Sequence, residues 1–119
     1  MNLNEIAEYI VSDGKGILAA DESNPTCGKR FDTINVENTE NNRRDYREML
    51  FRSKGMKDNI GGVILFDETL QQNAIDGTPL RKIIEDQGAF PGIKVDNGLI
   101  PLKEGSDEVV TQGLDGLHQ

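Results

Sequence analysis

The sequence has very few of the residues that build disulfides, zinc sites or membrane spans. Its 119 residues include one cysteine, Cys27, and one histidine, His118. A single cysteine cannot form an internal disulfide and fits a reducing compartment, and two ligands this far apart do not make a zinc site. No apolar run approaches the roughly 18 residues of a spanning helix, and Glu5 stands where a signal peptide would carry positive charge. We therefore expect a cytoplasmic protein without a metal.

Positive charge is also scarce. The sequence has 13 Lys and Arg against 21 Asp and Glu, a formal net charge of −8. The electrostatic field of a negatively charged protein repels polyanions, so we do not expect nucleic acid or an anionic membrane as a partner. Only 35% of the residues are hydrophobic, which is low for a domain that covers both faces of a parallel sheet. The composition predicts a thin core.

The sequence does contain a repeated pattern in which glycine precedes a short apolar run and a charged residue lies at or near the end of that run. Strands are expected at three such runs, at 17–20, 63–66 and 93–96. Asp21 closes the first run, Asp67 follows the second, and Lys94 lies within the third. The three strands are expected to present polar groups near their carboxyl ends.

Helical patterns lie before and between these runs. A first short helix is indicated by the spacing of Ile6, Tyr9 and Ile10. A second is expected from an N-cap at Asn38 or Thr39 to about Ser53, with an apolar stripe of Tyr46, Met49 and Leu50. A third is expected to begin with Thr78 as N-cap and Pro79 as its first residue, and to end near Gly88.

Three further segments lie outside these expected strands and helices. Asn24-Pro25 is expected to break the chain after the first strand. Asn97-Gly98 is expected to begin a turn or short hairpin loop, and the tail from Leu102 onward shows no clear periodicity.

Strands that alternate with helices predict an α/β fold with a parallel sheet, in which ligands bind at the carboxyl ends of the strands. Side chains along a strand alternate between faces, so Asp21 shares a face with Ile17, and Lys94 shares one with Gly92. If the sheet closes into a barrel, Asp21 and Lys94 could point inward together. The alternative is that Lys94 interrupts a half-exposed edge strand and extends into solvent.

Hydroxyls and cations follow the first strand. Ser23, Thr26, Lys29 and Arg30 could together meet a phosphate, but they match no Walker loop or GxGxxG motif, and a solvated basic turn is the alternative. The same alternative applies to the arginines of the second helix, where acids are interleaved and surface ion pairs are expected: Arg43, Arg44 and Arg47. Cys27 is expected to be a small, partly buried filler.

Six segments give the chain a resemblance to class I fructose-bisphosphate aldolases. They are GKGILAADES (14–23), GKR (28–30), VENTENNRRDYREMLF (36–51), GGVILFDETL (61–70), PGIKVDNG (91–98) and TQGLDGL (111–117). They occur in the family's order at nearly its spacing, and together they cover almost the whole chain.

The resemblance implies a (β/α)8 barrel, a cytosolic location, a homotetramer and a Schiff-base mechanism that needs neither metal nor cofactor. The implied reaction is the reversible cleavage of fructose 1,6-bisphosphate to dihydroxyacetone phosphate and glyceraldehyde 3-phosphate. Asp21 matches the aspartate used at the hydroxyl chemistry of the scissile bond, and Lys94 matches a lysine beside the Schiff-base lysine. The implied sugar-phosphate contacts are Ser23, Thr26, Lys29, Arg30 and Arg43.

The resemblance also implies that parts of the site are missing. A barrel of this kind has eight strands in about 250 residues, and the family's Schiff-base lysine, catalytic glutamate and second phosphate site follow the segment matched here. Residues 1–119 are therefore expected to be the first three βα units, the N-terminal part of a single barrel domain, and to be inactive alone. The alternative is a truncated, non-catalytic fragment that binds a sugar phosphate or pairs with a complementary chain.

Overall fold

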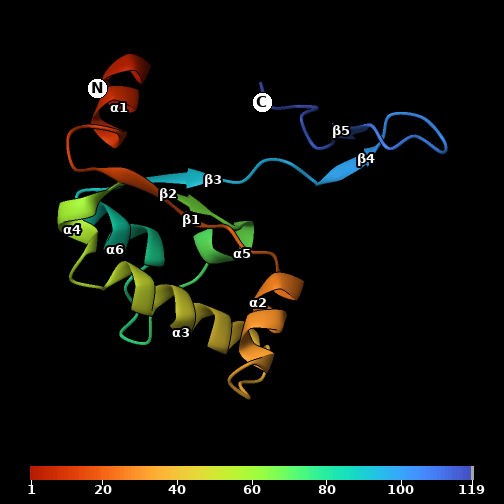
Figure 1. Cartoon of the computed structure of the whole chain (residues 1–119). Coiled ribbons are helices and arrows are strands. Elements are labelled where there is room, and N and C mark those ends of the chain that lie inside the picture. The colour runs from red at the N-terminus through yellow and green to blue at the C-terminus, as the bar shows by residue number, and fades with distance from the viewer. Residues whose placement is uncertain (119) are drawn as a thin grey trace.

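A three-stranded parallel sheet forms the centre of the computed structural model, which describes residues 1–118 (Figure 1). Its strands are β1 (Gly16–Ala20), β2 (Ile60–Leu65) and β3 (Phe90–Ile93), in the order β1-β2-β3. Both pairings are parallel, with Ala20 opposite Leu65 and Leu65 opposite Ile93. Helices connect the strands, so the predicted α/β fold with a parallel sheet is confirmed.

In the part of the chain that the structure describes, six helices precede or follow the strands. They are α1 (Leu3–Ile10), α2 (Asn24–Asp32), α3 (Glu40–Phe51), α4 (Met56–Asn59), α5 (Asp67–Leu70) and α6 (Leu80–Asp86). Two of them, α1 and α3, begin with a side-chain cap. Thr39 is the N-cap of α3, as expected, and its hydroxyl accepts a hydrogen bond from the backbone N–H of Asn42 at 3.1 Å. None of the helices within residues 1–118 has the length and apolar content that a membrane crossing requires.

The two faces of the sheet are covered unequally. One face packs against α3 and α6, and the buried core lies there: Ala20, Phe51, Met56, Val63, Leu65, Ala74, Leu80, Ile83, Ile84 and Ala89. The opposite face, which we call the open face, is crossed only by α1 near the start of the strands (Figure 1). Ile17 lies on this face and is 54% exposed.

Glycine permits α1 to approach the sheet closely. A Cβ atom at Gly61 would collide with the carbonyl group of Ile10, and one at Gly62 would lie 3.2 Å from the Ile10 side chain. Gly61 and Gly62 therefore form the part of β2 that contacts α1. The strand begins at Ile60, three residues before the start predicted at Val63.

The structure corrects several local predictions. Asn24-Pro25 does not break the chain but starts α2, because proline fits the first turn of a helix, where its missing N–H has no partner to lose. β3 begins at Phe90 rather than Ile93 and includes Pro91, which an edge strand tolerates. In α6 the N-cap is Pro79 rather than Thr78.

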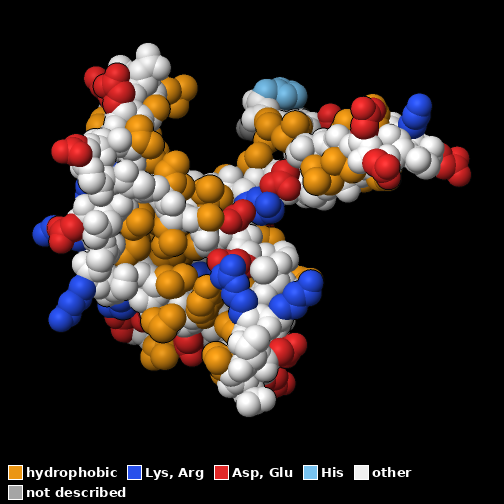
Figure 2. Space-filling model, in the orientation of Figure 1, with side chains coloured by type: hydrophobic (Ala, Val, Ile, Leu, Met, Phe, Trp, Pro, Cys, Tyr) orange, Lys and Arg blue, Asp and Glu red, His pale blue; other side chains and the backbone are white. Residues whose placement is uncertain are grey.

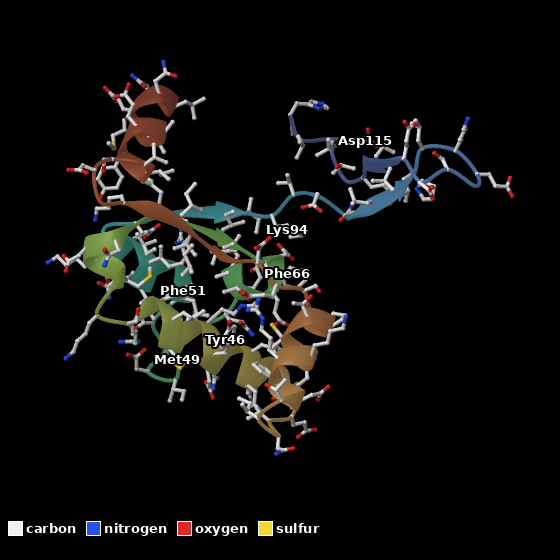
Figure 3. The ribbon with its side chains drawn as sticks, in the orientation of Figure 1. Tyr46, Met49, Phe51, Phe66, Lys94 and Asp115 are labelled. Atoms are coloured by element: carbon white, nitrogen blue, oxygen red, sulfur yellow. The ribbon has the colours of Figure 1, made fainter. Side chains whose placement is uncertain are left out.

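The buried face of α3 also differs from the prediction. Met49 is 61% exposed and points away from the sheet, whereas Phe51 is fully buried beneath it (Figure 3). The other buried residues of α3 are Arg43 and Arg47, so the expectation that these two arginines form surface ion pairs was wrong. Arg44 does pair at the surface, with Asp45 at 2.8 Å.

An antiparallel hairpin follows β3 and consists of β4 (Leu99–Pro101) and β5 (Val109–Thr111). The tail from Leu102 onward, for which no periodicity was expected, therefore contains the strand β5. Asn97-Gly98 precedes β4 rather than forming the loop between the strands. The hairpin projects from the sheet, and apolar side chains are exposed along it (Figure 2). We call residues 97–118 the arm and residues 1–93 the body.

Candidate active site

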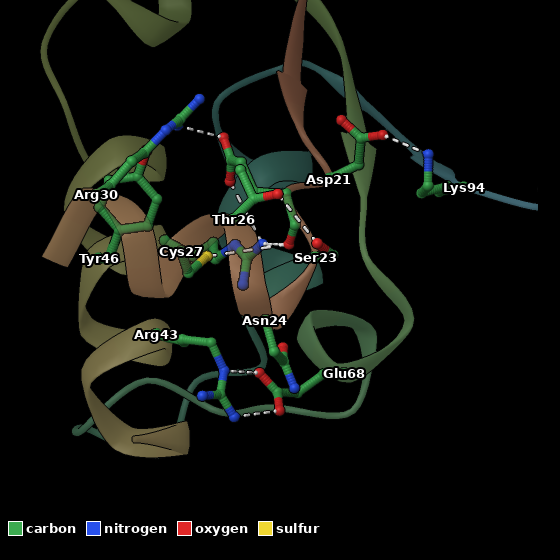
Figure 4. A network of polar contacts seen from close by, with 12 residues as sticks. Asp21, Ser23, Asn24, Thr26, Cys27, Arg30, Arg43, Tyr46, Glu68 and Lys94 are labelled. Carbon is green, nitrogen blue, oxygen red and sulfur yellow. Dashed lines mark hydrogen bonds and ion pairs between the residues drawn. The ribbon is translucent and has the colours of Figure 1, made fainter. Parts of the chain in front are cut away.

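Asp21 and Lys94 meet at the carboxyl ends of the outer strands. Asp21 directly follows β1 and Lys94 directly follows β3, and the Nζ atom of Lys94 lies 3.4 Å from Oδ2 of Asp21 (Figure 4). The Asp21 side chain is 26% exposed and the Lys94 side chain 32%, so both remain accessible from solvent. The juxtaposition that alternation along the strands predicted is therefore present, across 73 residues of sequence.

A second carboxylate also binds the lysine. Asp96 Oδ1 lies 2.8 Å from Lys94 Nζ, closer than Asp21, and its other oxygen accepts the backbone N–H of Gly98 at 3.0 Å. The hydrogen bond with Asp96, followed by that with Asp21, raises the pKa of Lys94. Conversely, the bond from Lys94 lowers the pKa of Asp96. Lys94 is therefore held as an ammonium ion at neutral pH.

The predicted hydroxyl pair lies at the start of α2. Ser23 is the N-cap residue of this helix, but its side chain does not make the usual capping bond. Instead Ser23 Oγ and Thr26 Oγ1 are 3.0 Å apart (Figure 4). The two hydroxyls are separated by one helical turn, and they lie close to Asp21, which directly follows β1.

Of the predicted phosphate-binding cations, Arg30 and Lys29 remain exposed. Arg30 Nη1 donates to Glu22 Oε1 at 2.9 Å and to the Tyr46 hydroxyl at 3.0 Å, yet 55% of the Arg30 side chain is exposed. The hydrogen bond to Tyr46, with the charge of Glu22, raises the pKa of Arg30. The guanidinium therefore keeps free surface that an anion could reach.

Arg43 is less available. Its Nε and Nη2 atoms each donate to one oxygen of Glu68 at 2.8 Å, and Nη1 donates to Asn38 Oδ1 at 2.8 Å (Figure 4). This bidentate bond holds the pKa of the Glu68 carboxyl below its ordinary value. A phosphate could bind Arg43 only by displacing Glu68 or by moving the helix.

Behind Asp21, Arg47 and Cys27 both contact the backbone carbonyl of Glu22. The sequence did not indicate a place in the site for Arg47 or for Glu22. Arg47 is completely buried, and its Nη2 atom donates to the backbone carbonyl of Glu22 at 2.6 Å. Cys27, which is buried as expected, points its thiol at the same carbonyl at 3.9 Å. Burial raises the pKa of this thiol despite the nearby arginines, so it is a neutral packing group. The signal for Glu22 was its position in the ADES segment, directly after Asp21.

The geometry thus defines an α/β protein that presents an acid, a lysine and hydroxyls at the carboxyl ends of parallel strands, the usual location of a binding site in this class. A sequence model of class-I fructose-bisphosphate aldolases matches residues 2–119. The chain belongs to the class I fructose-bisphosphate aldolase family.

Individual relatives agree with this assignment. The chain is 60% identical over 116 residues to a fructose-bisphosphate aldolase of Drosophila melanogaster and 55% identical over 115 residues to fructose-bisphosphate aldolase 7, cytosolic, of Arabidopsis thaliana. Each alignment covers 97% of this chain and 32% of the relative. The chain therefore spans about a third of the length of these relatives.

A solved structure shows the same likeness in three dimensions. It is the fructose-bisphosphate aldolase of Plasmodium falciparum in complex with TRAP and a small-molecule inhibitor. The similarity has a TM-score of 0.89 at 49% identity and covers 94% of this chain and 32% of the other. The fold of the matched segment is thus that of the corresponding part of an aldolase.

Proposed function

We propose that residues 1–119 are the N-terminal part of a class I fructose-bisphosphate aldolase. The protein would cleave fructose 1,6-bisphosphate reversibly in the cytoplasm, without metal or cofactor. One observation carries this proposal: the 3.4 Å approach of Lys94 to Asp21 at the carboxyl end of the sheet, in a chain of this family.

Asp21 and Lys94 would act on the substrate rather than form the covalent bond to it. A Schiff base needs a free amine, whereas the two carboxylates beside Lys94 raise its pKa and keep it protonated. Lys94 is thus suited to stabilise negative charge. Asp21 would orient a substrate hydroxyl at the scissile bond. The iminium would form on a lysine outside residues 1–119, as the family resemblance implies.

The sugar phosphate would bind beside the start of α2. The exposed guanidinium of Arg30 can supply charge, and the hydroxyls of Ser23 and Thr26 can donate hydrogen bonds. Lys29 would add a second, exposed cation. Arg43 would take part only if a phosphate replaced Glu68 as its partner.

The open face would line the interior of a (β/α)8 barrel, of which β1, β2 and β3 are the first three strands. In such a barrel the helices form an outer ring, and α3 and α6 cover the other face of the sheet. The complete protein would assemble as a homotetramer.

Trapping with borohydride tests the reaction. Incubating the complete protein with dihydroxyacetone phosphate and borohydride is expected to leave a covalent adduct, and peptide mapping is expected to find it on a lysine other than Lys94. The 119-residue chain alone is expected to give neither adduct nor cleavage. A complete protein without an adduct, or turnover by the short chain, would contradict the proposal.

The exposed edge strands favour a second candidate, a non-catalytic fragment that pairs with a complementary chain. Ile17 and Ile93 are 54% and 42% exposed on strands that are both sheet edges, and unpaired edges readily recruit further strands. Sedimentation of the 119-residue chain with a chain carrying the remaining family segments distinguishes the two. Formation of a complex that lacks cleavage activity would favour this candidate.

A further inference from the structure

Arg47 is the most deeply buried charged residue described, and its contacts converge on the residue after Asp21. Its side chain has no exposed surface. The Nη2 atom donates to the Glu22 backbone carbonyl at 2.6 Å and lies 3.4 Å from Oε2 of the Glu22 carboxylate. Arg47 comes from α3, on the side of the sheet opposite the open face. The Arg47 side chain therefore approaches the residues after β1 from the covered face of the sheet.

Glu22 is fixed on three sides. Its carbonyl accepts from Arg47 and from the Cys27 thiol, and its carboxylate accepts from Arg30 at 2.9 Å. The Glu22 carbonyl belongs to the Glu22–Ser23 peptide, which is planar and is joined through the Glu22 Cα to the peptide that follows Asp21. Fixing this carbonyl therefore limits how far the main chain next to Asp21 can rotate. Within residues 1–118, the polar side-chain partner of Asp21 is Lys94, at 3.4 Å. Its position thus depends on the main chain behind it.

Packing alone does not explain an arginine at this place. Within the described residues, Nε and Nη1 of Arg47 are buried without a hydrogen-bond partner, which is unfavourable for a charged group. An apolar side chain of similar volume would avoid this cost. The contacts that an apolar residue could not make are those to the carbonyl and the carboxylate of Glu22, of which the carbonyl bond is the shorter.

We propose that Arg47 is a positioning residue, which holds the main chain at Glu22 so that Asp21 meets Lys94 and the substrate. This inference rests on the proposed aldolase function. Arg47 touches neither Asp21 nor the open face, so it acts on turnover only through the geometry of the β1 end. A displacement of about 1 Å at a reacting group can reduce the rate on the order of 100-fold.

The test uses the complete protein that carries this chain. Arg47→Met is expected to lower kcat by about 10- to 100-fold and to raise KM less than it lowers kcat, because Glu22 also adjoins Ser23 and binds Arg30. The borohydride adduct is still expected to form, since its lysine lies elsewhere. Arg47→Lys keeps a charged donor for the Glu22 carbonyl and is expected to recover most of the lost kcat.

Phe51→Leu is the matched control. Phe51 is also fully buried on α3, where it belongs to the apolar core, and its side chain has no group that could hydrogen-bond to the Glu22 carbonyl. This variant is expected to lower the melting temperature and to leave kcat within about twofold. If Arg47→Met fails to fold, Arg47→Gln replaces it with the same expected loss of kcat.

The results separate the two proposals. A wild-type protein that neither cleaves the bisphosphate nor forms the adduct overturns the aldolase function itself. An active wild-type protein overturns the positioning role if the Arg47→Met or Arg47→Gln variant keeps kcat within twofold, if Phe51→Leu loses as much kcat, or if Arg47→Lys is no better than Arg47→Met.

Discussion

The body and the arm are both built from short elements, but different contacts hold them. In the body, residues distant in sequence pack together, as when Phe51 and Ile84 cover the side of the sheet that carries Leu65. In the arm, the bonds are local: Leu102 N–H donates to the Glu108 carbonyl at 2.8 Å, and Gln112 N–H to that of Gly98 at 2.8 Å. Every residue of β4 and β5 is exposed.

The difference between the arm and the body shows how little stability backbone hydrogen bonds provide when few side chains pack together. A two-stranded hairpin has its ladder of hydrogen bonds but buries little apolar surface, and it is marginally stable in water. The body gains its stability from burial, which is the dominant favourable term in folding. Lys94 lies where the two regions join, so the candidate site depends on the body for its position.

Truncating a core residue should have the largest effect. Leu65→Ala is expected to lower the free energy of unfolding by about 2–5 kcal/mol, because it removes buried methyl groups and leaves a cavity. Urea unfolding of the 119-residue chain, followed by circular dichroism, measures the free energy of unfolding. A Leu65→Ala variant that shows no folded baseline without urea would also agree with the expected loss. Ile100→Ala, the matched change in the arm, is expected to change the value by less than about 0.5 kcal/mol. Equal losses would mean that the arm is packed as tightly as the body.

Removing the charge of Glu68 should have the next largest effect. Glu68→Gln is expected to reduce stability by about 1.5–3 kcal/mol at pH 7, the range for hydrogen bonds to charged groups, because Glu68 receives both bonds from Arg43. Glu104→Gln, in the exposed loop of the arm, is the control and is expected to have no measurable effect.

The same pair predicts a dependence on pH. The pKa of Glu68 in the folded chain lies below its ordinary value of 4.5. Its contribution is therefore fully present above the unfolded pKa and is lost as the pH falls through the folded pKa. Unfolding measured from pH 7 downward should show wild type and Glu68→Gln converging below about pH 4.5. A constant difference across that range would exclude the ion pair as the cause.

The smallest effect concerns access rather than stability. Cys27 is buried, and burial raises the pKa of its thiol, so its alkylation at pH 8 should be slow until the body opens. Ser106→Cys, placed in the arm loop of a Cys27→Ala chain, should react at least about tenfold faster, which corresponds to about 1.4 kcal/mol of opening. Iodoacetamide labelling followed by mass spectrometry gives both rates, and equal rates would mean that the body opens as readily as the arm.

Local signals predicted the parts of the fold that depend on neighbours in sequence. Thr39 started α3 as expected because an N-cap needs only the next few backbone groups. The alternation of side chains indicated that Asp21 and Lys94 could face each other if the sheet closed into a barrel, and the two side chains do meet, each on the residue directly after its strand. Where two local signals competed, the prediction failed: Pro25 was interpreted as a break, although proline is equally suited to the first turn of a helix.

The sequence alone determined the α/β order and the parallel sheet, and it offered the meeting of Asp21 and Lys94 as one of two alternatives. These follow from periodicity, capping and the geometry of a strand, which act over a few residues. Only the tertiary structure decided that Arg43 and Arg47 are buried, because the cost of burying a charge is set by its partners, and these lie 25 residues away, at Glu68 and Glu22. The structure also decided that the arm, despite its regular strands, stands apart from the core.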